Sequence, residues 1–148
     1  MKTIKKILYA TDFSESSVPA CDYALTLAKL AKAQVHVLHV IGEFADSRKS
    51  MIQPEAMALL EREVEVQAIK DMEGFCKERF DGGISFTTEV VMGIPFQEII
   101  KKAGELSVDL IVVGTHGRTG LEHVIVGSTA ERLVRRSPIP VLTVRATD

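Results

Sequence analysis

Short apolar runs alternate with longer amphipathic stretches along this chain, and the alternation constrains its fold more than any other feature. Some runs are continuously apolar, such as Leu110 to Val113, which is typical of strands covered by helices on both faces. Because parallel strands need crossovers, the pattern predicts an α/β fold with a single open, doubly wound sheet of five parallel strands and helices on both faces. The predicted strands are Ile4–Thr11, Gln34–Ile41, Ser85–Val91, Leu110–Gly114 and Val141–Val144.

The amphipathic stretches between these runs predict four helices, which begin near Val18, Pro54, Pro95 and Ser128. The second is long and runs to about Phe80. Their apolar residues recur at helical spacing and are Val18, Cys21, Leu25, Ala28, Met57, Leu60, Val64, Ala68, Met72, Phe75, Phe96, Ile99, Ile100, Ala103, Ala130, Leu133 and Val134. We expect the last seven to be buried. The polar, irregular stretch from Gly42 to Pro54 predicts a mobile surface loop.

Length, charge and cysteine content narrow the class of protein. A chain of 148 residues has the usual size of one domain. The formal net charge is −2 and there is no basic stripe with aromatic residues, which argues against a nucleic-acid partner. No apolar run approaches the roughly 20 residues that span a bilayer, so we expect no membrane partner. Cys21 and Cys76 fall at apolar helical positions outside any CxxC pair, which predicts core thiols in a reducing cytoplasm.

The carboxyl ends of the predicted strands are where an open α/β sheet binds ligands. The richest of them is the glycine-rich segment from Gly114 to Thr129, which includes Gly117 and Gly120. Glycines let a backbone approach an anion, and a helix that begins at Ser128 offers unpaired N–H groups and the positive end of its dipole. Ser128, Thr129 and Arg118 add hydroxyl donors and a cation. The segment therefore suits phosphate, although the same residues also suit a plain turn in which Ser128 only caps the helix.

The spacing Gly114-x2-Gly117-x9-Gly127-Ser128 resembles the nucleotide-binding motif of the universal stress protein family at every fixed position. Four further segments agree in order: Ile7 to Ser14, His39 to Ile41, Gly93 to Pro95, and Ser137 to Leu142. The chain is similar to the ATP-binding branch of that family, which keeps the motif glycines. The resemblance covers residues 1–148 and implies a nucleotide-binding domain with an adenine nucleotide alpha hydrolase-like fold.

The resemblance implies roles for individual residues and a ligand, which is ATP, ADP or AMP with Mg²⁺. Asp12 is expected to accept hydrogen bonds from the ribose, although it also suits the start of the first helix as a cap. His116 either contacts the phosphates or orients the loop. The adenine is expected to lie against Ala10, Thr11 and either Val40 or Ile41. Met92 and Gly93 are expected to close the nucleoside pocket. The phosphates are expected to bind at Gly114, Gly117, Gly127, Ser128 and Thr129.

The sequence favours binding over efficient catalysis, because no evident general base lies beside the glycine-rich segment. Glu122 is the only carboxylate within the motif and is expected to be solvated. We therefore expect a stress-response or signalling protein with the nucleotide state acting as a switch; a slow Mg-dependent ATPase and a non-catalytic dimeric interaction module remain alternatives. A phosphorylation receiver is disfavoured because Met92-Gly93 and Arg145 stand where a receiver needs an aspartate and a lysine.

The apolar strand Val141–Val144 is expected to lie at the edge of the sheet, which predicts a homodimer formed through this last strand.

Overall fold

A computed structural model describes residues 1–42, 51–80, 82–115 and 127–146. Five strands form one sheet in the order β3-β2-β1-β4-β5, and each neighbouring pair is parallel. The strands are β1 (Lys6–Ala10), β2 (Gln34–Gly42), β3 (Phe86–Gly93), β4 (Leu110–Gly114) and β5 (Val141–Val144). The helices are the short 3₁₀ turn η1 (Glu15–Ser17), α1 (Val18–Ala31), α3 (Pro54–Arg79), α4 (Pro95–Glu105) and α5 (Ser128–Arg136). The predicted fold class is confirmed.

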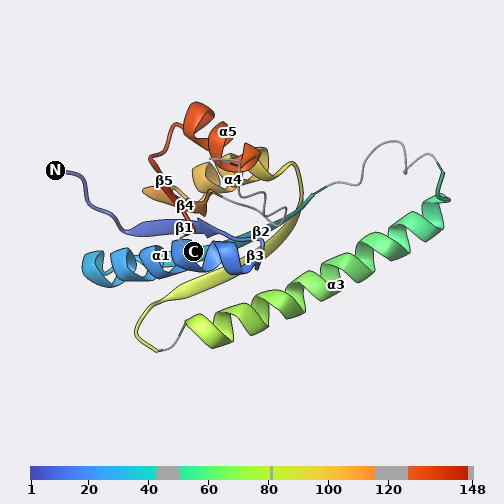
Figure 1. Ribbon diagram of the computed structural model, residues 1–148, viewed down its shortest axis with the longest axis horizontal. Coiled ribbons are helices and arrows are strands. Elements are labelled where there is room, and N and C mark those ends of the chain that lie inside the picture. Colours follow the sequence, from blue (N-terminus) through green and yellow to red (C-terminus); the bar gives the residue numbers. More distant parts are fainter. Residues whose placement is uncertain (43–50, 81, 116–126, 147–148) are drawn as a thin grey trace.

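The helices cover both faces of the sheet and divide the core into two layers (Figure 1). On one face, Ile7 and Tyr9 of β1 pack in a cluster that includes Cys21 of α1 and Phe75 of α3. On the other face, Leu8 of β1 packs in a second cluster, with residues of α4 and α5. Successive β1 side chains thus enter opposite layers, as expected for a strand that is buried on both sides.

Both cysteines lie in the first of these layers, as predicted. Cys21 and Cys76 are buried and form no disulfide. Burial raises the pKa of the Cys21 thiol to about 12 and that of Cys76 to about 11. Thiols with such pKa values are almost entirely protonated near neutral pH, so they act as small core residues rather than as nucleophiles.

Helix α5 corrects one expectation about the core. Ala130 and Leu133 are buried as predicted, but Val134 is 60% exposed. Adjacent residues on a helix point about 100° apart, so a helix that buries Leu133 turns its neighbour away from the sheet.

Helix α3 packs on the sheet through only part of its length. Its buried residues are Ala68, Met72, Phe75 and Cys76, all in the C-terminal half. In the N-terminal half, Leu59 is 61% exposed and Leu60 is 36% exposed, and Figure 1 shows this half extending past the strands. No described helix has the length and hydropathy needed to cross a membrane.

Candidate functional site

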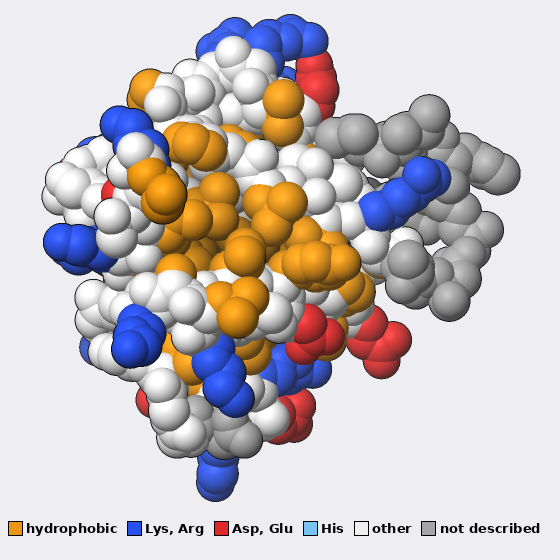
Figure 2. Space-filling view, turned by 90° about the vertical axis from the view of Figure 1, so that its left-hand side faces the viewer, with side chains coloured by type: hydrophobic (Ala, Val, Ile, Leu, Met, Phe, Trp, Pro, Cys, Tyr) orange, Lys and Arg blue, Asp and Glu red, His pale blue; other side chains and the backbone are white. Residues whose placement is uncertain are grey.

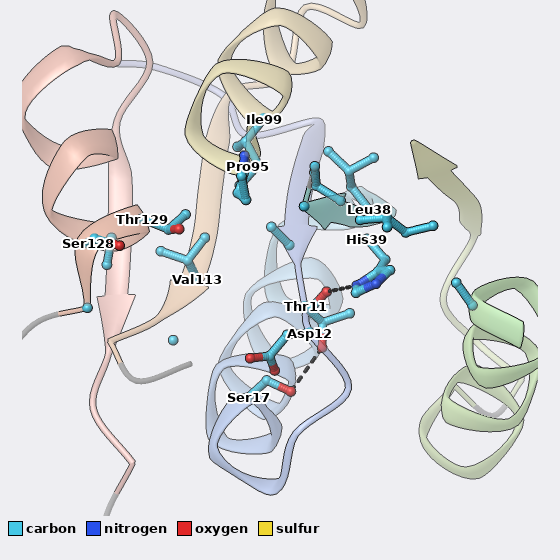
Figure 3. Close-up of a pocket in the computed structure, with 18 of the residues that line it drawn as sticks. Thr11, Asp12, Ser17, Leu38, His39, Pro95, Ile99, Val113, Ser128 and Thr129 are labelled. Carbon is cyan, nitrogen blue, oxygen red and sulfur yellow. Dashed lines mark hydrogen bonds between the residues drawn. The ribbon is translucent and has the colours of Figure 1, made fainter. Parts of the chain in front are cut away.

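The strand order creates a crevice at the carboxyl edge of the sheet. From β1 the chain crosses to β2 on one side, whereas from β4 it crosses to β5 on the other side, so the winding reverses between the adjacent strands β1 and β4. Open α/β sheets bind ligands at this position. A cavity of about 840 Å³ opens there, between the ends of β1, β2 and β4, the start of α5 and the middle of α3 (Figure 3).

The turn that follows β1 forms one wall of the cavity and is held by its own hydrogen bonds. The Thr11 and Ser17 hydroxyls lie 2.9 Å apart, and the buried Tyr9 hydroxyl donates to the Ser17 carbonyl at 2.7 Å. Burial raises the pKa of the Tyr9 phenol, so it stays a donor. The backbone at Phe13 is left-handed, with φ 65°, and its N–H donates to the Thr11 hydroxyl at 3.0 Å. The turn therefore presents Asp12 from a fixed backbone.

Asp12 has a structural role and also lines the cavity. Its Oδ1 accepts from the Ser14 N–H at 2.9 Å and from the Ser14 hydroxyl at 2.5 Å. Asp12 therefore stabilises a local turn and is not a helix cap, because the N-cap residues of η1 and α1 are Ser14 and Ser17. The carboxylate is thus oriented by the turn toward the crevice between β1 and α5 (Figure 3).

Strand β2 extends past the end of β1 and exposes one backbone edge to the cavity. Leu38 is the last β2 residue to pair with β1, and its carbonyl accepts from Thr11 N–H at 3.0 Å. In a parallel ladder the backbone groups of alternate residues point to the same neighbouring strand. Val40, two residues after Leu38, therefore points its N–H and C=O to the side of β1, which has already ended at this level. Neither group has a hydrogen-bond partner among the residues that the structure describes.

His39 helps to end this ladder. Its Nδ1 lies 2.7 Å from the Thr11 carbonyl, the next acceptor that β1 would offer to Val40. Because a carbonyl only accepts, Nδ1 carries the proton in this bond. The ring is buried and packs on Phe13, with ring centroids 4.3 Å apart. His39 thus has a structural role, and the same side chain lines the cavity.

The N-terminus of α5 lies across the cavity and is rich in hydrogen-bond donors (Figure 3). The Gly127 N–H donates to the Thr115 carbonyl at 2.5 Å, and the first intrahelical bond joins Glu131 N–H to Gly127 C=O. The amides of Ser128, Thr129 and Ala130 therefore lack an acceptor within the described part of the chain. These amides and the two hydroxyls form an electropositive pole, which we call the α5 pole.

Part of the cavity wall was not predicted from the sequence. Helix α3 contributes Val64, Gln67, Ala68 and Asp71, and α4 contributes Pro95 and Ile99. The α3 residues stand at positions i, i+3, i+4 and i+7, which is the spacing of one helix face. That spacing identifies a face but not its partner, so nothing in the sequence connected α3 with the strand ends.

Met92 and Gly93, predicted to close the pocket, do not line this cavity. Met92 is 36% exposed and borders a separate hollow of about 260 Å³ between β3 and α3. Gly93 has a backbone reason to be glycine: its φ is +155°, and a Cβ there would lie 2.8 Å from Cγ of Glu98. The other predicted residues within the described ranges do line the cavity: Ala10, Thr11, Asp12, Val40, Ile41, Gly114, Gly127, Ser128 and Thr129.

The remaining predicted residues, His116, Gly117, Arg118 and Gly120, lie outside the described residues. Within the described ranges, no group of three or more His, Cys, Asp or Glu side chains could hold a metal ion. A cation at this site would therefore depend on oxygen atoms brought by the ligand.

Comparison with known proteins identifies the class. The model of the universal stress protein family matches residues 3–145, so the chain belongs to this family. Universal stress protein MJ0577 of Methanocaldococcus jannaschii is 33% identical over 153 aligned positions, which cover 95% of this chain and 94% of that protein. YxiE of Bacillus subtilis is 32% identical, with 95% and 98% covered.

Solved structures agree with this assignment. The structure of MJ0577 superimposes with a TM-score of 0.87 at 36% identity and covers 99% of both chains. A universal stress protein solved in complex with cAMP superimposes with a TM-score of 0.62 and covers 99% of this chain and 100% of that one; at 23% identity this likeness shows the fold alone.

Proposed function

We propose that this protein binds an adenine nucleotide in the cavity at the carboxyl edge, and that the nucleotide state acts as a switch in stress response or signalling. The observation that carries the proposal is the α5 pole, where the amides of Ser128, Thr129 and Ala130 open beside the cavity without protein acceptors in the described part of the chain. Unpaired amides at a helix N-terminus are a general solution for binding phosphate. The family resemblance of the glycine motif points to the same ligand.

The N–H and C=O groups of Val40, which have no partner in the described part of the chain, support adenine as the base. The Val40 N–H is a donor and its C=O an acceptor, which complement the ring N1 acceptor and the amino donor of adenine. Guanine presents the opposite pattern, a ring N–H donor and an oxo acceptor. A buried polar edge that meets the wrong pattern leaves groups unpaired, which is how such sites reject an analogue. Asp12 lies between this edge of Val40 and the α5 pole, and we expect it to accept from ribose hydroxyls.

Magnesium belongs to the proposal as a companion of the phosphates. Mg²⁺ commonly binds through substrate phosphates, waters and one or two protein oxygens. The hydroxyls of Ser128 and Thr129 are the protein oxygens at the α5 pole, and both residues line the cavity. The buried, unpaired thiols of Cys21 and Cys76 support a reducing cytoplasm as the compartment.

The test is a thermal-shift titration with ATP, ADP, AMP and GTP, with and without Mg²⁺. Adenine nucleotides are expected to raise the melting temperature, since a ligand at about 100 times its Kd stabilises the folded state by about 2.7 kcal/mol. Thr129→Val removes one of the two hydroxyls at the α5 pole, and Gly127→Val places a bulky side chain at the start of α5. The first should weaken the shift and the second should abolish it.

A matched control is Thr88→Val, because Thr88 is an exposed β3 residue away from the cavity. It should leave the shift unchanged. Absence of any shift with all three adenine nucleotides would contradict the proposal. Prolonged incubation with ATP and Mg²⁺, followed for ADP, separates a binding protein from a slow ATPase.

We also propose a homodimer formed through β5. This strand pairs only with β4 and forms one edge of the sheet. The carbonyls of Pro140 and Val144 accept from β4 and the residue after it, so the N–H groups of Val141 and Thr143 point away from the sheet. Figure 2 shows hydrophobic side chains gathered on the side of the molecule where β5 lies in Figure 1. An apolar open edge invites pairing with its own copy across a two-fold axis.

Thr143→Pro tests the dimer, since proline removes an outward N–H without removing a bond to β4. Sedimentation is expected to show a dimer for the unmodified protein and a monomer for this variant, while Thr143→Val stays dimeric. A pure monomer of the unmodified protein at micromolar concentration would refute the proposal.

A further inference from the structure

The wall that α3 contributes to the cavity carries one pair of polar side chains. Gln67 and Asp71 line the cavity together with the apolar Val64 and Ala68 of the same helix face. The Gln67 side-chain nitrogen donates to Asp71 Oδ1 at 3.0 Å. This bond between residues i and i+4 holds both polar groups at the same turn of α3.

The pair is rich in acceptors. The bond consumes one N–H of Gln67. The Gln67 carbonyl oxygen and the second carboxylate oxygen of Asp71 remain as acceptors, the second N–H of Gln67 remains as a donor, and both residues are exposed. Within the described residues, no Lys, Arg or His nitrogen lies within 4 Å of the Asp71 carboxylate to offset its charge. The uncompensated charge of Asp71 therefore favours a ligand group that donates hydrogen bonds to it and repels an anionic group.

The cavity is thus polarised across its length. Donors gather at the α5 pole, and acceptors gather on α3, which lies on the opposite side of the strand ends (Figure 3). Asp12 lies between the two sides. A nucleotide that sets its phosphates at the α5 pole and its ribose beside Asp12 directs its base toward Val40 and α3.

We propose that Gln67 and Asp71 accept a hydrogen bond from the exocyclic amino group of the base, so that Asp71 determines specificity for an amino purine over an oxo purine. The inference rests on the proposed function and assigns a residue to the choice of base. An amino group has two hydrogens: one suffices for the Val40 carbonyl, and the other is available to α3. A 6-oxo purine presents a lone pair there, which the Asp71 carboxylate repels.

The experiment compares ATP with ITP, in which an oxo group replaces the amino group and ring N1 carries a hydrogen. The change at N1 meets Val40 in every variant alike, so a change in the ATP-to-ITP preference between variants reports the contact with α3. Dissociation constants are measured by calorimetry for the unmodified protein and for Asp71→Asn. In this variant the new amide oxygen can still accept from Gln67, and its NH₂ group turns a donor toward the base. We expect the preference for ATP over ITP to fall by about tenfold or more, as is typical when a hydrogen bond to a charged group is lost.

Two further variants make the result specific. Glu73→Gln removes a charge from an exposed position of α3 that does not line the cavity, and it should leave the preference unchanged. Gln67→Leu should reduce the preference in the same direction as Asp71→Asn. Melting temperatures without ligand confirm that each variant is folded.

An unchanged ratio of the two affinities in Asp71→Asn, with ATP still bound, overturns the inference and leaves the proposed function standing. An equal loss of affinity for ATP and for ITP also overturns the inference, because such a loss shows an effect of charge alone and no recognition of the amino group. If the unmodified protein binds no adenine nucleotide, the proposed function itself fails.

Discussion

The backbone amides at the two edges of the sheet differ in whether described residues accept hydrogen bonds from them. At the amino edge, the amides of Lys5 and Lys6 donate to Asp109 Oδ2 at 2.8 and 3.0 Å. At the carboxyl edge, the amides of Ser128, Thr129 and Ala130 have no acceptor among the described residues, and a cavity opens beside them. One edge supplies its own carboxylate, whereas at the other edge the described residues supply no acceptor.

This difference shows where a binding function resides in the fold. Both edges expose N–H groups that the strand or helix ladders do not use, and such groups need a partner when they are shielded from water. At the amino edge the two amides hold the pKa of the Asp109 carboxyl below its ordinary value, which means that they favour its charged form. The α5 pole has the same chemistry, and no carboxylate of the described residues accepts from its amides, so a ligand anion can take that place.

Ser128→Asp should convert the carboxyl edge into a copy of the amino edge. A carboxylate at the first position of α5 satisfies the helix N-terminus from within the protein, which raises the stability of the ligand-free protein by about 0.3–1 kcal/mol. The same charge repels nucleotide phosphates, so we expect ATP affinity to fall by about 100-fold. Calorimetry and thermal unfolding measure the two effects.

Ser128→Asn is the matched control, because it keeps a polar side chain at the start of α5 without a charge. Its ATP affinity should stay within a few-fold of that of the unmodified protein. If Ser128→Asp binds ATP as tightly as the unmodified protein does, phosphates do not contact the α5 pole and the comparison of the two edges loses its functional meaning.

The succession of strands and helices along the chain was predictable because short apolar runs alternate with amphipathic stretches. The predicted bounds of β4 and β5 agree with the structure. Strand β1 is shorter than predicted at both ends: it begins at Lys6 rather than Ile4, and it ends at Ala10 because the chain then turns toward η1. The exposure of the N-terminal half of α3 was not predictable. Leu60 shares a helix face with Ala68, yet only Ala68 is buried, because burial depends on where the sheet beneath the helix ends.

The site was predictable where it is built from strand ends and not where it is built from packing. Asp12, Val40 and Gly127 line the cavity because parallel strands and the following helix meet at one edge. Gln67 and Asp71 depend on how α3 crosses the sheet, which no local pattern encodes. Gly93 matched the family motif, but its left-handed φ gives it a conformational role that a motif does not distinguish from contact with a ligand.

The smallest effect is expected at the amino edge, from Asp109→Asn. Asparagine keeps an acceptor for the Lys5 and Lys6 amides but loses the charge, and the site is exposed, so the free energy of unfolding near pH 7 should fall by a few tenths to about 1 kcal/mol. Chemical unfolding curves of the two proteins measure the difference. ATP affinity should not change, because Asp109 lies at the opposite edge from the cavity.

The pH dependence identifies the cause. The pKa of the Asp109 carboxyl is lowered in the folded state from its ordinary value of 3.8, so its stabilisation is fully present above that value and is lost as the pH falls through the lower folded-state pKa. The difference between Asp109→Asn and the unmodified protein should therefore be constant near neutral pH and disappear in strong acid. A difference that persists where both side chains are neutral would show that geometry, rather than charge, satisfies the amides at this edge, and the analogy with a bound phosphate at α5 would fail.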